Sequence, residues 1–436
     1  MLLVVLNSFV TAPQAHAYSV LSHEEIVDLT WHDNIVPVLM ARFPGTTPDA
    51  IHQAHAYAYG GCIIQDIGYY PFGDKFFSDL LHYVRTGDFV NNLIMEASDV
   101  NELAFALGAL AHYSADTYGH PAVNAATAQE YPKLRDKYGN VVTYDDNPTA
   151  HLQTEFGFDV VEVAHNRYAP LQFHDFIGFE VSKPLLERAF RDTYGFEVSQ
   201  ILTHEDLAIG SYRRSVSGLI PKMTRVALVD YGKQIEKENP GFDRRAFLYR
   251  IKRSQYEKDF GKEYQKPGVG SHILAFFLRL LPKVGPLRAL SLHIPNSGSQ
   301  ALFLKSIETT TQHYRAYLDT LRGQSLRGGN LELADLNLDT GGATISGQYR
   351  LTDETYSKLL SAIEKHPQTP VPVSLRSNVL AFYQSSKDNF VRHHAKQWQQ
   401  TEANLHLLEN AHTVELKVSD QPTSQQQPSV PVASPN

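Results

Sequence analysis

The chain of 436 residues is long enough for one large hydrophobic core or for two domains. Its hydrophobic content of 42% and charged content of 20% are those of an ordinary globular protein. A formal net charge of −8 excludes a basic surface for extended nucleic-acid binding, and the single cysteine, Cys62, excludes an intrachain disulfide. Stability must therefore come from sources other than an intrachain disulfide, packing first among them.

The N-terminus has the features of a secretory leader. An apolar stretch at residues 2–10 is followed by Ala15-His16-Ala17, a pattern typical of signal-peptidase cleavage. The stretch is too short to span a bilayer. We therefore predict that residues 1–17 are a signal peptide, that Tyr18 is the first mature residue, and that the protein is secreted or periplasmic. A freed α-amino group has a pKa of about 7.7–8.0 and can bind a metal once it has lost its proton.

The strongest motif in the chain lies at the end of a helix predicted over residues 99–118. His112, Asp116 and His120 follow one another at intervals of four residues, so they emerge along one face of a helix. The preceding residues 103–111 are almost wholly apolar, which indicates that this helix is buried. A buried carboxylate is costly unless it pairs with a cation. Pro121 is expected to end the helix.

Further candidate ligands lie on both sides of this motif. His151 and Glu155 repeat the same spacing on a helix predicted over residues 148–167. Upstream, Asp66 lies in a glycine-flanked apolar segment, His82 lies on a short amphipathic helix, and His23 opens the first helix, for which Ser22 is the expected N-cap. Imidazole and carboxylate without thiolate suit zinc or a similar first-row ion in a hydrolytic site.

Helical periodicity dominates the rest of the chain. The exceptions are a long loop expected at 122–147, a disordered tail at 421–436, and a change toward period two near 331–339 and 413–418, which favours a small sheet or hairpin with Gly341-Gly342 as a turn. Asp335 and Asp339 lack the rest of a known calcium loop. A basic helical region at 213–253 is either a solvated face or a contact for an anionic membrane surface. The predicted helices cover residues 24–42, 48–60, 74–84, 99–118, 148–167, 180–192, 204–236, 243–261, 299–322, 352–365 and 375–409.

The order of these candidate ligands resembles that of the zinc-dependent phospholipase C family, to which the S1/P1 nucleases are related. The resemblance covers residues 18–200 and implies an all-α catalytic domain with up to three zinc ions, followed by a mostly helical region at 201–420. It assigns the ligands to three ions as follows. Asp66, His82, His112 and Asp116 would hold the first zinc; His120, His151 and Glu155 the second; and Tyr18 and His23, with a bridging Asp116, the third.

The resemblance also implies the reaction. Asp66 would be the general base in hydrolysis of a phosphodiester by a metal-activated water, with phospholipids as the first expected substrates and peripheral membrane contact as a consequence. A nuclease of the related branch is the alternative enzyme, and a non-catalytic binding protein with structural metal is the alternative of another class. Ile67 stands where choline-selective relatives have an aromatic residue, which counts against choline. The net charge of −8 counts against a polynucleotide substrate.

Overall fold

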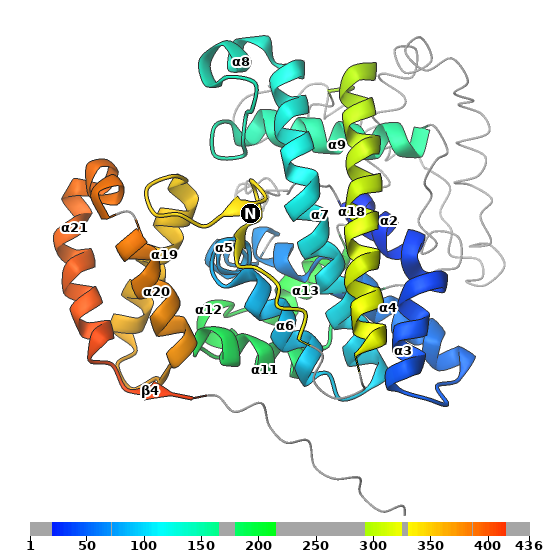
Figure 1. Ribbon diagram of the computed structural model, residues 1–436, viewed down its shortest axis with the longest axis horizontal. Coiled ribbons are helices and arrows are strands. Elements are labelled where there is room, and N and C mark those ends of the chain that lie inside the picture. The colour runs from blue at the N-terminus through cyan, green and yellow to red at the C-terminus, as the bar shows by residue number, and fades with distance from the viewer. Residues whose placement is uncertain are drawn as a thin grey trace, which may run out of the picture.

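The computed structural model describes residues 20–70, 72–164, 179–214, 293–324, 330–385 and 387–415, and this part of the chain is mostly helical, as predicted (Figure 1). The N-terminal helices are α2 Val20–Thr30, the π-helical turn η1 Trp31–Ile35, α3 Val36–Arg42, α4 Pro48–Gly61, the 3-10 turn η2 Ile64–Tyr69, α5 Lys75–Tyr83, α6 Thr86–Glu96, α7 Val100–Glu130, α8 Pro132–Tyr138 and α9 Pro148–Ala164. The later elements are α11 Lys183–Tyr194, α12 Val198–Ile201, α13 Glu205–Arg214, α18 Ser297–Gly323, β1 Leu336–Asn337, β2 Gly342–Ala343, α19 Arg350–Lys365, β3 Val371–Pro372, α20 Val373–Ser385, α21 Lys387–Glu409 and β4 Thr413–Val414.

Helix α7 is the central element, and α4 and α18 pack along it (Figure 1). The crossing of α4 with α7 depends on glycine: a Cβ at Gly108 would lie 2.0 Å from the carbonyl oxygen of Ala58, and one at Gly61 would lie 1.9 Å from that of Phe105. The two backbones can therefore approach closely. This brings the end of α4 beside the His112 turn of α7. On α18, the Tyr314 hydroxyl donates to the carbonyl oxygen of Leu107 at 2.8 Å.

The described helices beyond residue 200 share one buried apolar core with the first half of the chain. For example, Phe303 of α18 stacks on Phe158 of α9, with ring centroids 4.5 Å apart. The division at residue 200 stays a prediction. The predicted leader 1–17, Tyr18, the helix 243–261, most of the basic region and the tail 421–436 lie outside the described residues.

The prediction that Pro121 ends its helix is wrong, because α7 continues to Glu130 and α8 occupies much of the expected loop. A proline in a helix removes the N–H that would bond to the carbonyl four residues earlier, here Thr117. In this fold the β1–β2 turn packs against that carbonyl: a Cβ at Gly341 would lie 2.2 Å from the Thr117 oxygen. Buried apolar residues beyond the proline, such as Val123 and Ala126, keep the continuation against the core.

The start of the first helix also differs from its prediction. Ser22 lies inside α2 instead of capping it, and its hydroxyl donates to Asp159 Oδ1 on α9 at 2.6 Å. The main-chain N–H of Leu21 donates to Asp159 Oδ2 at 3.2 Å. Asp159 therefore fixes the amino end of α2 against α9, one turn beyond Glu155.

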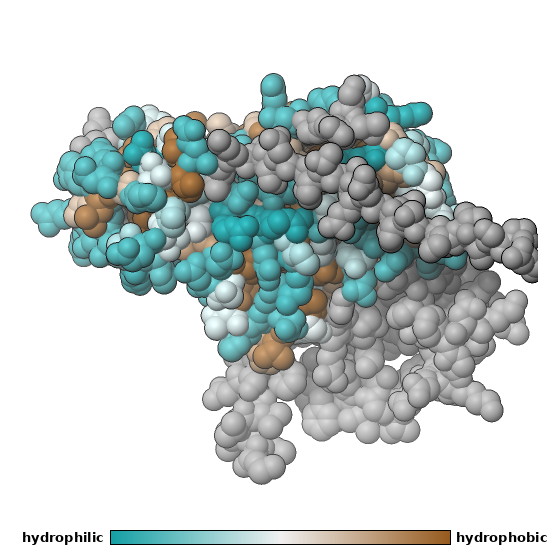
Figure 2. Space-filling model, turned by 90° about the horizontal axis from the view of Figure 1, so that it is seen from below, coloured by the Kyte–Doolittle hydropathy of each residue, from teal (hydrophilic) through white to brown (hydrophobic). Residues whose placement is uncertain are grey.

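The small hairpin is confirmed: β1 and β2 pair antiparallel, and their turn contains Gly341 at a φ of +66°. The second short pair, β3 with β4, is parallel. The described surface in the view of Figure 2 is mostly hydrophilic, with small and separate hydrophobic spots. Among the described helices, none combines the length and the apolar character needed to cross a membrane.

Candidate metal centre

Eight of the predicted ligands converge in the interior from five separate elements. Each of these side chains is buried, with an exposed fraction of 5% for Asp66 and of 0–1% for the others. Tyr18 lies outside the described residues. The ligands are His23 on α2, Asp66 on η2, His82 on α5, His112, Asp116 and His120 on α7, and His151 and Glu155 on α9.

The first cluster joins Asp66, His82, His112 and Asp116. Nε2 of His82 lies 3.3 Å from Asp66 Oδ1 and 3.4 Å from Asp116 Oδ2. Nε2 of His112 lies 3.1 Å from the same Asp116 oxygen and 3.5 Å from Nε2 of His82. The ligand atoms of Asp66, His82 and His112 thus lie close to one another, and Asp116 contacts both imidazoles of this group. These are the four ligands that the resemblance implies for the first zinc.

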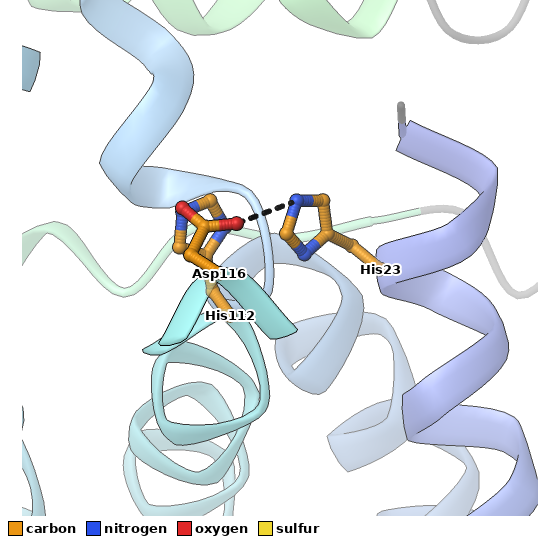
Figure 3. Close-up of side chains that lie close together, drawn as sticks. All are labelled: His23, His112 and Asp116. Atoms are coloured by element: carbon orange, nitrogen blue, oxygen red, sulfur yellow. Dashed lines mark ion pairs between the residues drawn. The ribbon is translucent and has the colours of Figure 1, made fainter. Parts of the chain in front are cut away.

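A second cluster shares Asp116 with the first. Figure 3 shows His23 from α2 facing Asp116 and His112 on α7, with Nε2 of His23 3.6 Å from Asp116 Oδ1. The rings of His23 and His112 stack, with centroids 4.2 Å apart. Since Oδ1 faces His23 and Oδ2 faces the other two imidazoles, the Asp116 carboxylate has the geometry of a bridging ligand.

The third cluster consists of His120, His151 and Glu155. The α9 pair lies four residues apart, and Nε2 of His151 is 2.6 Å from Glu155 Oε1. The rings of His120 and His151 have centroids 5.5 Å apart. His120 lies one helical turn after Asp116, so α7 connects this cluster to the other two.

The outer ring nitrogens of three histidines are held by main-chain carbonyl oxygens. Nδ1 of His82 donates to Ser78 at 2.7 Å, and Nδ1 of His112 donates to Cys62 at 2.9 Å. Nδ1 of His120 donates to Leu338. Because a carbonyl oxygen can only accept, Nδ1 carries a proton in each ring, and Nε2 is the nitrogen that faces the cluster.

The electrostatics of the clusters suit a cation. Burial, followed by the charge of His112, lowers the pKa of His23, and burial, followed by the charge of His120, lowers the pKa of His151, both well below the usual range. These rings are neutral near pH 7, and the neutral ring is the form that ligates metal. Burial favours the protonated form of Asp116, but the charges of His112 and His120 outweigh it and hold its pKa well below the usual range.

Two atoms of the third cluster show that the residues fit a metal. In the described part of the chain, Nε2 of His120 and Oε2 of Glu155 have no hydrogen-bond partner, although both residues are buried. Burial, followed by the charge of Asp116, raises the pKa of Glu155 well above its usual range. Orphaned polar atoms cost free energy in the interior, and a divalent cation would satisfy both of these at once.

The fold and the site together are those of an α-helical metalloenzyme with three candidate ligand clusters of imidazole and carboxylate. Residues 22–200 match the family described as zinc-dependent phospholipase C, and this part of the chain belongs to that family of phosphodiesterases. The match includes every predicted ligand except Tyr18. No curated protein and no solved structure matches the chain.

Sequence reasoning missed the residues that support the ligands. Asn124 continues the four-residue spacing of His112, Asp116 and His120, but the expected helix end at Pro121 concealed it. Asp339 is buried and accepts hydrogen bonds from the hydroxyls of Tyr83 and Tyr349, although its sequence pattern fits no metal-binding loop. Leu338 acts through its main chain, and main-chain contacts leave no mark on residue type.

Proposed function

We propose that the protein is a secreted or periplasmic hydrolase that uses up to three zinc ions to cleave phosphodiesters, phospholipids first. The observation that carries this proposal is the presence of three buried ligand clusters, two of which share His112, while the third begins at His120 on the same helix. Bound zinc would supply positive charge for the phosphate oxygens and lower the pKa of a water nucleophile. Membership of residues 22–200 in the zinc-dependent phospholipase C family supports both the metal and the substrate.

The candidate ligands would have different roles in the reaction. Asp116 keeps two metal positions close together through its two oxygens, while the rings of His82 and His112 fix one of them. Asp66 is the most exposed of the eight ligands, at 5%, so it is the one placed to exchange a proton with solvent. We assign it the role of general base. Peripheral contact with a lipid surface follows from such a substrate.

The substrate class is tested by comparing zinc-loaded enzyme on three kinds of phosphodiester. The probes are vesicles of phosphatidylcholine, vesicles of phosphatidylethanolamine with phosphatidylglycerol, and single-stranded DNA or RNA. We expect release of phosphorylated head groups from vesicles, and weaker release from phosphatidylcholine because Ile67 replaces an aromatic residue. Faster cleavage of nucleic acid would assign the nuclease alternative. Wild-type rates on every substrate from a zinc-loaded Asp66→Asn variant would contradict the assigned base.

The zinc assigned to Tyr18, His23 and Asp116 is tested by changing the N-terminus. The proposal uses the freed amino group of Tyr18 with His23 and Asp116 as ligands, so residues placed before Tyr18 remove a ligand. We expect a chain that begins at Tyr18 to hold one zinc more than a chain with a short extension before it, when both are measured by elemental analysis. The matched control is His52→Ala, which lies outside the clusters and should leave the zinc content unchanged. Equal zinc content in the extended and processed chains would refute the terminal ligand.

A further inference from the structure

A segment far beyond the family-matched residues forms hydrogen bonds with two of the candidate ligands. We propose that the β1–β2 turn, residues 336–341, holds His120 in its metal-binding orientation, and that Asn124 and Asp339 are positioning residues for that turn. The inference rests on the proposed zinc centre and adds a part of the chain to it. No ligand atom comes from this segment; it acts on the ligands through main-chain hydrogen bonds.

Leu338 contacts two candidate ligands at once. Its carbonyl oxygen accepts from Nδ1 of His120, and its N–H donates to the carbonyl oxygen of His82 at 3.0 Å. Leu338 has an exposed fraction of 1%, so water does not compete for these bonds. One residue therefore ties the third cluster, through His120, to the first cluster, through His82.

The neighbouring residue, Asp339, anchors the turn on three sides. Its main-chain oxygen accepts a hydrogen bond from Asn124 Nδ2 at 2.9 Å. Asn124 lies one helical turn after His120. Its Oδ2 accepts from the hydroxyls of Tyr83 at 2.7 Å and Tyr349 at 2.6 Å. Tyr83 directly follows His82 on α5, and Tyr349 precedes α19. Asp339 thus connects α5 and α7, which bear candidate ligands, with the start of α19.

The shape of the turn is equally specific. Gly341 has a φ of +66°, which other residues adopt at a cost, and the space beside it is taken by the carbonyl oxygen of Thr117. Asn337 accepts from the N–H of Gly341 at 2.9 Å, and its own side chain donates to Thr352 at 3.0 Å. Any side chain at position 341 must move the turn away from α7, and Leu338 moves with it.

The consequence for metal binding concerns the His120 ring. If the carbonyl of Leu338 withdraws, Nδ1 and Nε2 compete for the proton and the ring is free to rotate. Loss of such an outer hydrogen bond typically weakens metal affinity about 10–100-fold. The effect should be largest for the zinc held by His120, His151 and Glu155, because the rings of His82 and His112 keep their own hydrogen bonds to Ser78 and Cys62.

The test compares full-length Asn124→Ala and Gly341→Ala with wild type, by zinc competition against a chromophoric chelator and by thermal unfolding with and without zinc. We expect one zinc per chain to bind about 10–100-fold more weakly, with the remaining zinc less affected. The stabilisation gained on adding zinc should be smaller in both variants than in wild type, in addition to any lowering of the unfolding temperature of the zinc-free proteins. Tyr356→Phe is the matched control, because it removes a buried hydroxyl bond to Asn378 away from the centre.

Two results would overturn the inference. One is wild-type zinc content and affinity in both folded variants. The other is a lower unfolding temperature of the zinc-free variants with unchanged zinc affinity, which is what a merely structural role would give. If Gly341→Ala does not fold, the zinc affinity of Asn124→Ala alone decides, because this substitution adds no side chain to the turn and leaves its backbone conformation accessible. A wild-type chain that binds no zinc would overturn the proposed function as well, so the two failures are distinguishable.

Discussion

Replacement of Asp116 by asparagine should abolish most of the activity. Asp116 faces His23 with one oxygen and His82 and His112 with the other, so the variant loses the negative charge that lies between these imidazoles and that the proposed metal centre requires. A metal acting on a phosphodiester contributes several kcal/mol to the transition state, and each 1.4 kcal/mol is worth a factor of ten, so kcat/KM should fall by about 10³-fold or more. The measurement is steady-state hydrolysis together with zinc content, which should fall in parallel.

The matched control for this variant lies on the same helix. Glu130, at the end of α7, is also a hydrogen-bonded carboxylate, but it accepts from the N–H of Asn296 and from His293, away from the ligands. Glu130→Gln should retain wild-type zinc content and kcat/KM. If Asp116→Asn behaves like this control, the bridging role is wrong.

Removal of zinc should destabilise the protein strongly. Without metal, buried imidazoles and carboxylates are left to satisfy one another, and burial, which raises the pKa of Glu155, makes its charged form costly. A ligand present at about 1,000 times its dissociation constant adds about 4 kcal/mol per site, and each kcal/mol shifts Tm by about 2–4 °C in a domain of about 150–250 residues and by less in a longer chain. Two such sites predict a fall in Tm of about 10 °C or more after chelation, and recovery on adding zinc.

The control for chelation is a chain with an incomplete centre. His112→Ala removes a ligand shared by two clusters and leaves His120, His151 and Glu155 in place, so its Tm should already be lower and should fall less than that of wild type on chelation. Calorimetry of the four samples, wild type and variant with and without chelator, gives the answer. An unchanged Tm in wild-type protein shown to have lost its zinc would mean that the metal does not contribute to the fold.

Much of the centre could be predicted because its chemistry is local. The spacing of His112, Asp116 and His120 follows from helix geometry alone, and so does the pair on α9. Residue type then indicates the metal. The structure brings these residues close to His23, Asp66 and His82 in the interior.

What could not be predicted depends on contacts between distant segments. The local rule for Pro121 predicts a helix end, but tertiary packing against the β1–β2 turn and the core lets α7 continue. Ser22 reads as an N-cap, yet its hydroxyl has a better acceptor in Asp159, across the fold. Leu338 supports His120 through a carbonyl that every residue possesses. In each case the deciding partner lies more than a hundred positions away along the chain.

The hydrogen bond between His120 and Leu338 also has a consequence for the time course of synthesis. Its partners are 218 residues apart, whereas the two α9 ligands are four apart. Contacts of such long sequence separation form late in folding because a large loop must first close. At about 5–20 residues per second, the intervening chain takes roughly 10–40 s to make. The emerging chain would therefore carry ligand helices long before their last support exists, which makes tight loading of the third cluster one of the final events in maturation.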